Sequence, residues 1–204
     1  MTLTEVLNVS RDDTWRLAIA VVLLVVLPLV AFHRVRAATG ERLDRRQEGA
    51  MQFAALRIFS GFFWIALFAY LFDPAWLAWS AVPLPGWSRA IGVACAFASV
   101  ALLAWTLPAL GRNLTDTVVT RNAHTLVITG PYRWVRHPFY LSMGILVMAL
   151  SIIAANWFLL VTGALLLAFL AGRTRREEAN LMLRFAEEYP VYRQRVGRFL
   201  PRIW

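Results

Sequence analysis

Long apolar runs separated by short polar segments make up most of this chain. Three of the runs, at about residues 15–32, 53–72 and 90–110, approach the roughly 20 residues that an α-helix needs to cross the hydrocarbon core of a bilayer. A fourth run, 139–171, is too long for one crossing, and the polar Asn156 near its middle predicts a tight hairpin of two helices. The pattern therefore predicts an all-α integral membrane protein with about five transmembrane helices.

The segments between the runs contain residues that begin or interrupt helices. Residues 73–87 combine prolines, which interrupt helices, with tryptophans, which prefer the headgroup region, so we expect an interfacial loop there. Pro138 is predicted to be the first residue of the fourth helix, since its fixed φ suits that position and its missing N–H would be unpaired there anyway. Arg57 lies inside the second run, where it either reaches the nearby interface or lines a cavity.

Composition supports the membrane assignment and suggests an orientation. Hydrophobic residues make up 59% of the chain and charged residues 16%, and the mean hydropathy is +0.57. The net charge is +9, but the arginines adjoin the apolar runs, which favours anionic lipid over nucleic acid as their partner. Segments 33–52, 111–137 and 173–204 carry five, four and eight arginines. Because five crossings place all three segments on one side, the positive-inside rule predicts an outside N-terminus and a cytoplasmic C-terminal helix.

One stretch, residues 130–140, concentrates polar chemistry directly before the fourth run. Its sequence, GPYRWVRHPFY, holds two arginines, a histidine and two tyrosines. With Pro138 at the first helical position, the unpaired N–H groups and the positive dipole end of the helix point back toward Arg136 and His137. This arrangement predicts an anion-binding site at the edge of the bilayer. Arginines and tyrosines beside a membrane helix are also typical of simple interfacial anchors.

Other polar motifs follow this stretch in a fixed order. HTLV occupies residues 124–127, Glu177 and Glu178 follow the hairpin, and FAEEYPVY occupies residues 185–192. Over roughly residues 110–201, this ordered set resembles the isoprenylcysteine carboxyl methyltransferase family and the related membrane phospholipid methyltransferases. The chain has Ser142 and Ala186 where the family often has glycine, and both positions bear on close packing more than on chemistry.

The resemblance implies an S-adenosylmethionine-dependent methyltransferase in which one domain, 1–204, has two halves. Residues 110–204 form the cofactor-binding half, and residues 1–109 form the membrane-spanning, substrate-access half. The acceptor is lipophilic: the carboxylate of a prenylated or other lipid-like substrate, with an amine or a thiol also open. Catalytic roles are implied for Arg136, Arg173 and Glu178. The residues implied to bind the cofactor are His124, Leu126, Val127, Gly130, Tyr132, His137, Pro138, Tyr140, Glu177 and Glu178.

The chemistry of these residue types is compatible with those roles. His137, Arg136 and the helix N-terminus suit the cofactor carboxylate, while the two glutamates suit its amino group or its ribose hydroxyls. For a carboxylate acceptor, Arg136 is expected to orient the substrate, bidentate where geometry permits. The chain has no glycine-rich dinucleotide-binding fingerprint and no alternation of strands and helices that could host one. We expect no metal requirement, since no His, Cys and Asp cluster has ligand spacing.

Two other functions are compatible with the same sequence features. The His-Pro-x-Tyr and acidic-helix pattern is also similar to the C-terminal region of membrane sterol-type reductases, which use NADPH. A small non-enzymatic membrane scaffold would bind no cofactor at all. Titration with both cofactors separates the three. Membrane lipids and a lipophilic substrate are the expected partners, nucleic acid is not, and the oligomeric state is not specified.

Overall fold

The chain folds into a bundle of helices, seen in a computed structural model that describes residues 3–38, 50–114 and 125–202. Within these residues there is no β-strand, only two isolated bridges. In the same ranges, short 3-10 helices connect the longer elements: η2 (Pro74–Ser80), η3 (Gly111–Asn113) and η4 (Gly130–Arg133). The α-helices described are α1 (Leu3–Ala37), α2 (Ala50–Phe72), α3 (Gly86–Leu110), α4 (Pro138–Ala154), α5 (Trp157–Arg184) and α6 (Glu188–Arg195).

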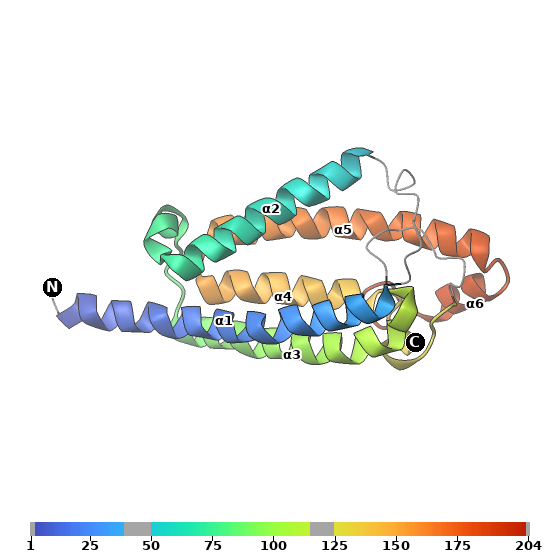
Figure 1. Ribbon diagram of the computed structural model, residues 1–204, viewed down its shortest axis with the longest axis horizontal. Coiled ribbons are helices and arrows are strands. Elements are labelled where there is room, and N and C mark those ends of the chain that lie inside the picture. Colours follow the sequence, from blue (N-terminus) through green and yellow to red (C-terminus); the bar gives the residue numbers. More distant parts are fainter. Residues whose placement is uncertain (1–2, 39–49, 115–124, 203–204) are drawn as a thin grey trace.

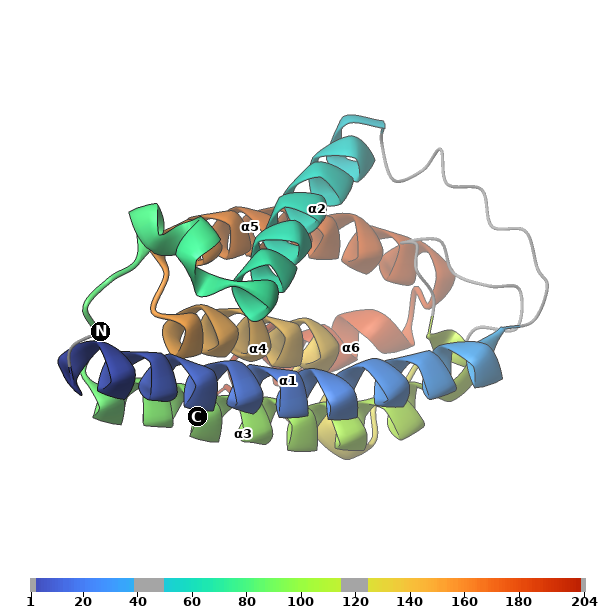
Figure 2. The same ribbon diagram turned by 60° about the vertical axis from the view of Figure 1, so that its left-hand side comes forward.

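The five long helices run up and down along the long axis of the molecule (Figure 1). Helix α4 lies in the middle, packed between α3 and α5, while α1 packs on α3 and α2 crosses α5 obliquely (Figure 2). Helices α1, α2, α3 and α5 each contain a segment long and apolar enough to cross a membrane, and α4 is a shorter apolar helix. Large apolar side chains such as Leu24 and Ile65 are exposed on the outside of the bundle, as lipid contact requires. The predicted all-α membrane fold is confirmed.

The predicted hairpin between the fourth and fifth helices is present at Asn156. The side chain of Asn156 begins α5 by accepting a hydrogen bond from the N–H of Leu159 at 3.1 Å. Its amide also donates to the carbonyl of Leu77 and the hydroxyl of Ser80, at 3.2 and 2.8 Å. The hairpin turn is therefore fixed to η2, which occupies the segment predicted as an interfacial loop. Pro138 is the first residue of α4, as predicted.

Some helix ends differ from those predicted by the apolar runs. Helix α1 begins at Leu3 rather than near residue 15, and α5 continues to Arg184, well past residue 171. The end of an apolar run indicates where the helix leaves the bilayer and not where the helix itself ends. A helix can therefore continue past the membrane surface through charged residues. Glu177 and Glu178 therefore lie on the last turns of a long membrane helix.

Two arginines join the helices at the end of the bundle away from α6. Arg16 donates to the carbonyls of Leu71 and Phe72, the last residues of α2. Arg89, which is buried, donates to the carbonyl of Ile153 at 2.7 Å and to the hydroxyl of Tyr70 at 2.9 Å. These bonds hold α1, α2, α3 and α4 together at this end. Arg57, by contrast, is exposed on α2, with its guanidinium 4.8 Å from the ring of Phe53, one turn closer to the helix start. This geometry favours the interfacial interpretation of Arg57.

Helices α4 and α5 approach each other closely at Gly163. A Cβ atom added to Gly163 would lie 2.5 Å from Cγ1 of Val147 and 3.3 Å from the ring of Phe63. The missing side chain therefore lets α5 pack directly against α4 and α2. This contact holds α5 in place, and α5 carries the two glutamates of the candidate site.

Candidate active site

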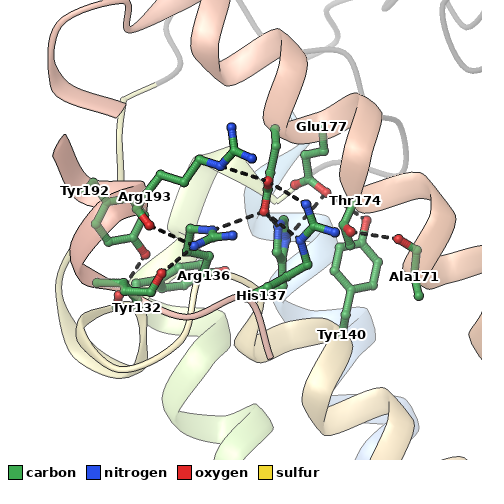
Figure 3. Close-up of polar contacts among 12 residues, drawn as sticks. Tyr132, Arg136, His137, Tyr140, Ala171, Thr174, Glu177, Tyr192 and Arg193 are labelled. Atoms are coloured by element: carbon green, nitrogen blue, oxygen red, sulfur yellow. Dashed lines mark hydrogen bonds and ion pairs between the residues drawn. The ribbon is translucent and has the colours of Figure 1, made fainter. Parts of the chain in front are cut away.

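The polar residues of the motif stretch gather where α4 begins and α5 ends (Figure 3). Side chains from η4, from the start of α4, from the end of α5 and from α6 point into one region. The segment that follows α6 closes this region by pairing with the backbone before α4. The N–H of Arg136 donates to the carbonyl of Gly197 at 2.8 Å, and the N–H of His137 donates to that of Arg198 at 3.1 Å.

Glu178 is the centre of the polar network. Its side chain is only 4% exposed, and its Oε1 accepts from Nε of Arg136 at 3.1 Å and from Nε of Arg198 at 3.0 Å. Oε2 accepts from Nη2 of Arg198 at 2.8 Å and lies 3.8 Å from Nε of Arg193. Nε2 of His137 lies 3.1 Å from Oε1. A buried carboxylate surrounded by these cationic and polar groups joins α5, the start of α4 and the C-terminal segment.

Arg136 also contacts the end of α6. Its Nη1 donates to the carbonyl of Arg193 at 3.1 Å and to the carbonyl of Val196. Its side chain is 8% exposed. The guanidinium therefore occupies the position of a helix C-terminal cap for α6 while it binds Glu178. In this arrangement an acceptor carboxylate would compete with protein oxygens for Arg136.

Glu177 has quite different surroundings from its neighbour. Its side chain is 32% exposed, against 4% for Glu178. Its Oε2 accepts from the hydroxyl of Tyr140 at 3.0 Å and lies 3.9 Å from Nδ1 of His137. Successive residues of an α-helix point about 100° apart, so one glutamate faces the protein and the other faces the accessible side. Glu177 is thus the carboxylate that a ligand can reach.

Three tyrosines form the wall of the site on the α6 side. Tyr132 is buried, and its carbonyl accepts from the hydroxyl of Tyr192 at 2.7 Å. Burial raises the pKa of the Tyr132 phenol, and the nearby charge of Glu177 raises it further. Burial likewise raises the pKa of Tyr192 and of Tyr189. All three therefore stay neutral in the physiological range. Among the described residues, the buried hydroxyl of Tyr189 has no hydrogen-bond partner.

An apolar groove of about 470 Å³ begins beside this polar network. It follows one face of α4 from Tyr140 to Ile152, a rise of roughly 18 Å at 1.5 Å per residue. Leu167 and Leu170 of α5, Cys95 of α3 and the ring of Phe199 complete its walls. Tyr140 belongs to both regions, because it lines the groove while its hydroxyl binds Glu177. Tyr140 thus connects the groove to the accessible glutamate.

The structure brings together most of the residues singled out from the sequence. Arg136, His137, Tyr140, Glu177 and Glu178 are in direct contact as described above. Tyr132 and Gly130 belong to η4, and Pro138 begins α4. Leu126 and Val127 are half-buried in the segment that leads into η4, and Arg173 is half-buried one turn before Glu177. His124 lies outside the described residues.

The sequence did not indicate two residues of the C-terminal segment. Arg198 donates to both oxygens of Glu178, and Phe199 lines the groove. Arg198 is one of eight arginines in the segment 173–204, so its sequence context does not distinguish it. The backbone pairing with residues 135–137 is a tertiary feature without a local sequence signal. Within the described part of the chain, no group of three or more His, Cys, Asp or Glu side chains is arranged to hold a metal ion.

Comparison with known proteins relates part of the chain to a known family. Residues 90–183 match the isoprenylcysteine carboxyl methyltransferase (ICMT) family. The protein-S-isoprenylcysteine O-methyltransferase of Homo sapiens is 37% identical over 100 residues, which are 46% of this chain and 34% of that protein. Just under half of the chain is therefore similar to the ICMT family. The chain spans about a third of the length of that curated ICMT relative. The matched region contains α4, most of α5, the motif stretch and both glutamates, and it ends before α6.

Two further matches extend this result. A solved structure of the eukaryotic intramembrane Ras methyltransferase ICMT superposes with a TM-score of 0.52 at 26% identity, covering 75% of this chain and 53% of that one. The nickel-cobalt-cadmium resistance protein NccN of Alcaligenes xylosoxydans xylosoxydans is 29% identical over 112 residues, 54% of this chain and 53% of that protein. The fold and the ICMT motif region therefore occur together in this chain.

Proposed function

We propose that this chain is an S-adenosylmethionine-dependent membrane methyltransferase that acts on a lipophilic acceptor. The observation that carries the proposal is the position of Glu177, an accessible carboxylate that is joined to an apolar groove through the hydroxyl of Tyr140. A lipid acceptor needs such a junction, because its chain must stay in an apolar environment while its polar end reaches the reactive group. The names of the curated ICMT relatives suggest isoprenylcysteine as the acceptor class, methylated at its carboxylate.

The residues present fit S-adenosylmethionine by their chemistry. When bound, this cofactor supplies an activated methyl group on a sulfonium. Glu177 offers a carboxylate for a ligand amino group or hydroxyls, and the N-terminus of α4 together with His137 offers donors for a carboxylate. The buried hydroxyl of Tyr189 is a further polar group beside the network. The tyrosines of this wall are neutral, so they can donate hydrogen bonds without adding charge.

The chain's own contribution to methyl transfer is positioning. A carboxylate acceptor is already a nucleophile, so orientation and electrostatics supply most of the rate and a strong general base is unnecessary. Arg136 is proposed to orient the acceptor carboxylate, exchanging one of its present backbone acceptors for it. The groove excludes water from the acceptor chain. An amine or thiol acceptor would instead need to lose a proton, for which His137 and Glu177 are the nearest groups. The site is proposed to face the cytoplasm.

The first experiment compares the two glutamates in the purified, detergent-solubilised protein. Isothermal titration with S-adenosylmethionine is followed by transfer of a labelled methyl group to N-acetyl-S-farnesylcysteine. Glu177→Gln should weaken cofactor affinity by roughly ten- to hundredfold, the value of a charged hydrogen bond, and should leave the melting temperature nearly unchanged. Glu178→Gln should instead destabilise the fold by about 3 kcal/mol or more, because it leaves buried cations without their carboxylate.

The same titration with NADPH tests the reductase alternative. Binding of NADPH and not of S-adenosylmethionine would refute the proposed function. Binding of neither would favour a scaffold. Equal loss of cofactor affinity in Glu177→Gln and Glu178→Gln, at unchanged stability, would contradict the division of roles between the two side chains.

A further inference from the structure

The segment that follows α6 closes the site from one side. We call residues 196–202 the C-terminal strap. Its backbone pairs with residues 135–137 through the two hydrogen bonds to Arg136 and His137 and through the bridge between Val135 and Gly197. The strap folds tightly on itself, since a Cβ atom at Gly197 would lie 1.9 Å from the carbonyl oxygen of Leu200. The strap lies beyond residues 90–183, which match the ICMT family.

Two consecutive strap residues contact different parts of the site. The guanidinium of Arg198 binds both oxygens of Glu178, at 3.0 and 2.8 Å, on the polar side. The ring of Phe199 lines the apolar groove and lies 5.9 Å from the ring of His137. The strap therefore forms the boundary between the polar network and the groove.

We propose that the C-terminal strap selects the acceptor: Phe199 contacts the acceptor chain where it leaves the polar site, and Arg198 is the positioning residue that holds Phe199 there. This inference rests on the proposed function. A chain that enters the groove from Glu177 passes Tyr140 and Phe199 first, because these two side chains lie at the polar end of the groove. A rigid aromatic ring at this point contributes apolar contact at little cost in side-chain entropy.

The contacts of Arg198 explain how the strap keeps its place. Two nitrogens of Arg198 donate to the two carboxylate oxygens of Glu178, so the contact is bidentate. Such a contact fixes the orientation of the guanidinium as well as its distance from the carboxylate. This hydrogen bonding raises the pKa of Arg198, so the ion pair persists at every physiological pH. Among the contacts described above, the bond to Glu178 is the side-chain contact made by the residue directly before Phe199, so it fixes the strap next to that ring.

The chain provides a reporter for the groove that does not depend on turnover. Cys95 is the single cysteine in the sequence, and it lines the same groove. The experiment measures the rate at which N-ethylmaleimide labels Cys95 in the full chain. The measurement is repeated at increasing concentrations of N-acetyl-S-geranylcysteine, N-acetyl-S-farnesylcysteine or N-acetyl-S-geranylgeranylcysteine. We expect at least one of these acceptors to protect Cys95 in the unmodified chain.

Phe199→Ala should raise the half-protecting concentration of all three acceptors by about tenfold, because the chains share the part that leaves the polar site and all lose the same aromatic contact. Phe199→Leu, which keeps an apolar side chain, should show a smaller effect. Leu200→Ala is the matched control, because Leu200 lies on the strap and is 73% exposed, and it should behave like the unmodified chain. Unchanged protection in Phe199→Ala, or no protection of Cys95 in any variant, would overturn the proposal.

Arg198→Gln tests the positioning role. It should raise the acceptor KM and the half-protecting concentration severalfold, with partial rescue in Arg198→Lys, while S-adenosylmethionine affinity changes little. Loss of cofactor affinity with normal protection would mean that Arg198 only neutralises Glu178, and the proposal would fall. Protection of Cys95 without methyl transfer to any acceptor would refute the proposed function and leave the strap assignment standing.

Discussion

Arg136 and His137 are adjacent in sequence but make different contacts in the network around Glu178. Arg136 donates to Glu178 and to two carbonyls at the end of α6, whereas the ring of His137 lies between the two glutamates. If the motif were only an interfacial anchor, the two residues would have equivalent roles, since both precede α4. Their different contacts indicate different roles. The planar guanidinium of Arg136 donates hydrogen bonds in fixed directions, whereas His137 lies close to the accessible Glu177.

Single substitutions should separate these roles. Arg136→Lys keeps the charge and loses the fork, so turnover should fall by roughly a hundredfold while S-adenosylmethionine affinity changes little. His137→Ala should weaken cofactor binding first. Steady-state kinetics and titration in the same detergent measure both effects. Arg133→Lys is the control, because Arg133 lies in the same motif with an exposed side chain. Equal, mild effects of all three changes would mean that the motif is only an anchor.

For single residues, the sequence predicted which side chains lie close together but not which of them are buried and which are accessible. His137, Tyr140 and the two glutamates belong to one ordered motif set, so their proximity could be predicted. The burial of Glu178 could not be predicted, because it depends on its contact with Arg198. Arg198 is held there by backbone pairing between segments that are distant in sequence. The exposure of Glu177 follows from the same burial, since the two side chains point in different directions from one helix.

Helix packing in this protein depends on close approach between α4 and α5. Gly163→Ala would place a methyl group 2.5 Å from Val147, so we expect a destabilisation of about 1–3 kcal/mol, visible as a lower melting temperature in detergent. Gly61→Ala is the matched control, since a Cβ atom there would meet nothing within 4 Å. Alanine favours the helix over glycine, so this variant should be neutral or slightly stabilised. A Gly163→Ala protein as stable as Gly61→Ala would contradict the packing described for α5.

At the scale of elements, the existence of the long helices could be predicted and their ends could not. Pro138 and Asn156 are strong local signals, and both act at the predicted places. The end of α5 has no such signal: arginines at 173, 175 and 176 suggest only where the bilayer ends, and the helix continues to Arg184. Helix η2 was likewise missed, because prolines and tryptophans indicate a loop without specifying its turns.

The whole molecule is polarised along its long axis. The start of α1 lies at one end of the bundle, and α6 with the candidate site lies at the other (Figure 1). Arg34 and Arg36 at the end of α1 share the α6 end with the arginines of the site, while Arg16 and Arg89 lie at the opposite end. This distribution matches the asymmetry that the positive-inside rule describes.

Topology can be tested directly with reporter fusions. A reporter joined before Met1 should be active outside the cell, and one joined after Trp204 should be active in the cytoplasm, because five crossings separate the two positions. Fusions in the segments 33–52 and 73–87 provide internal controls, the first expected in the cytoplasm and the second outside. Reporters at Met1 and Trp204 on the same face would refute a five-crossing topology.

The Glu178 network also sets an order of events during biosynthesis. Membrane helices enter the bilayer from the N-terminus onward, so Glu178 emerges from the ribosome before Arg193 and Arg198 do. Until those residues follow, the carboxylate lacks the partners that later bury it. The network is therefore complete only in a chain that extends through residue 198, because Arg198 donates to both oxygens of Glu178.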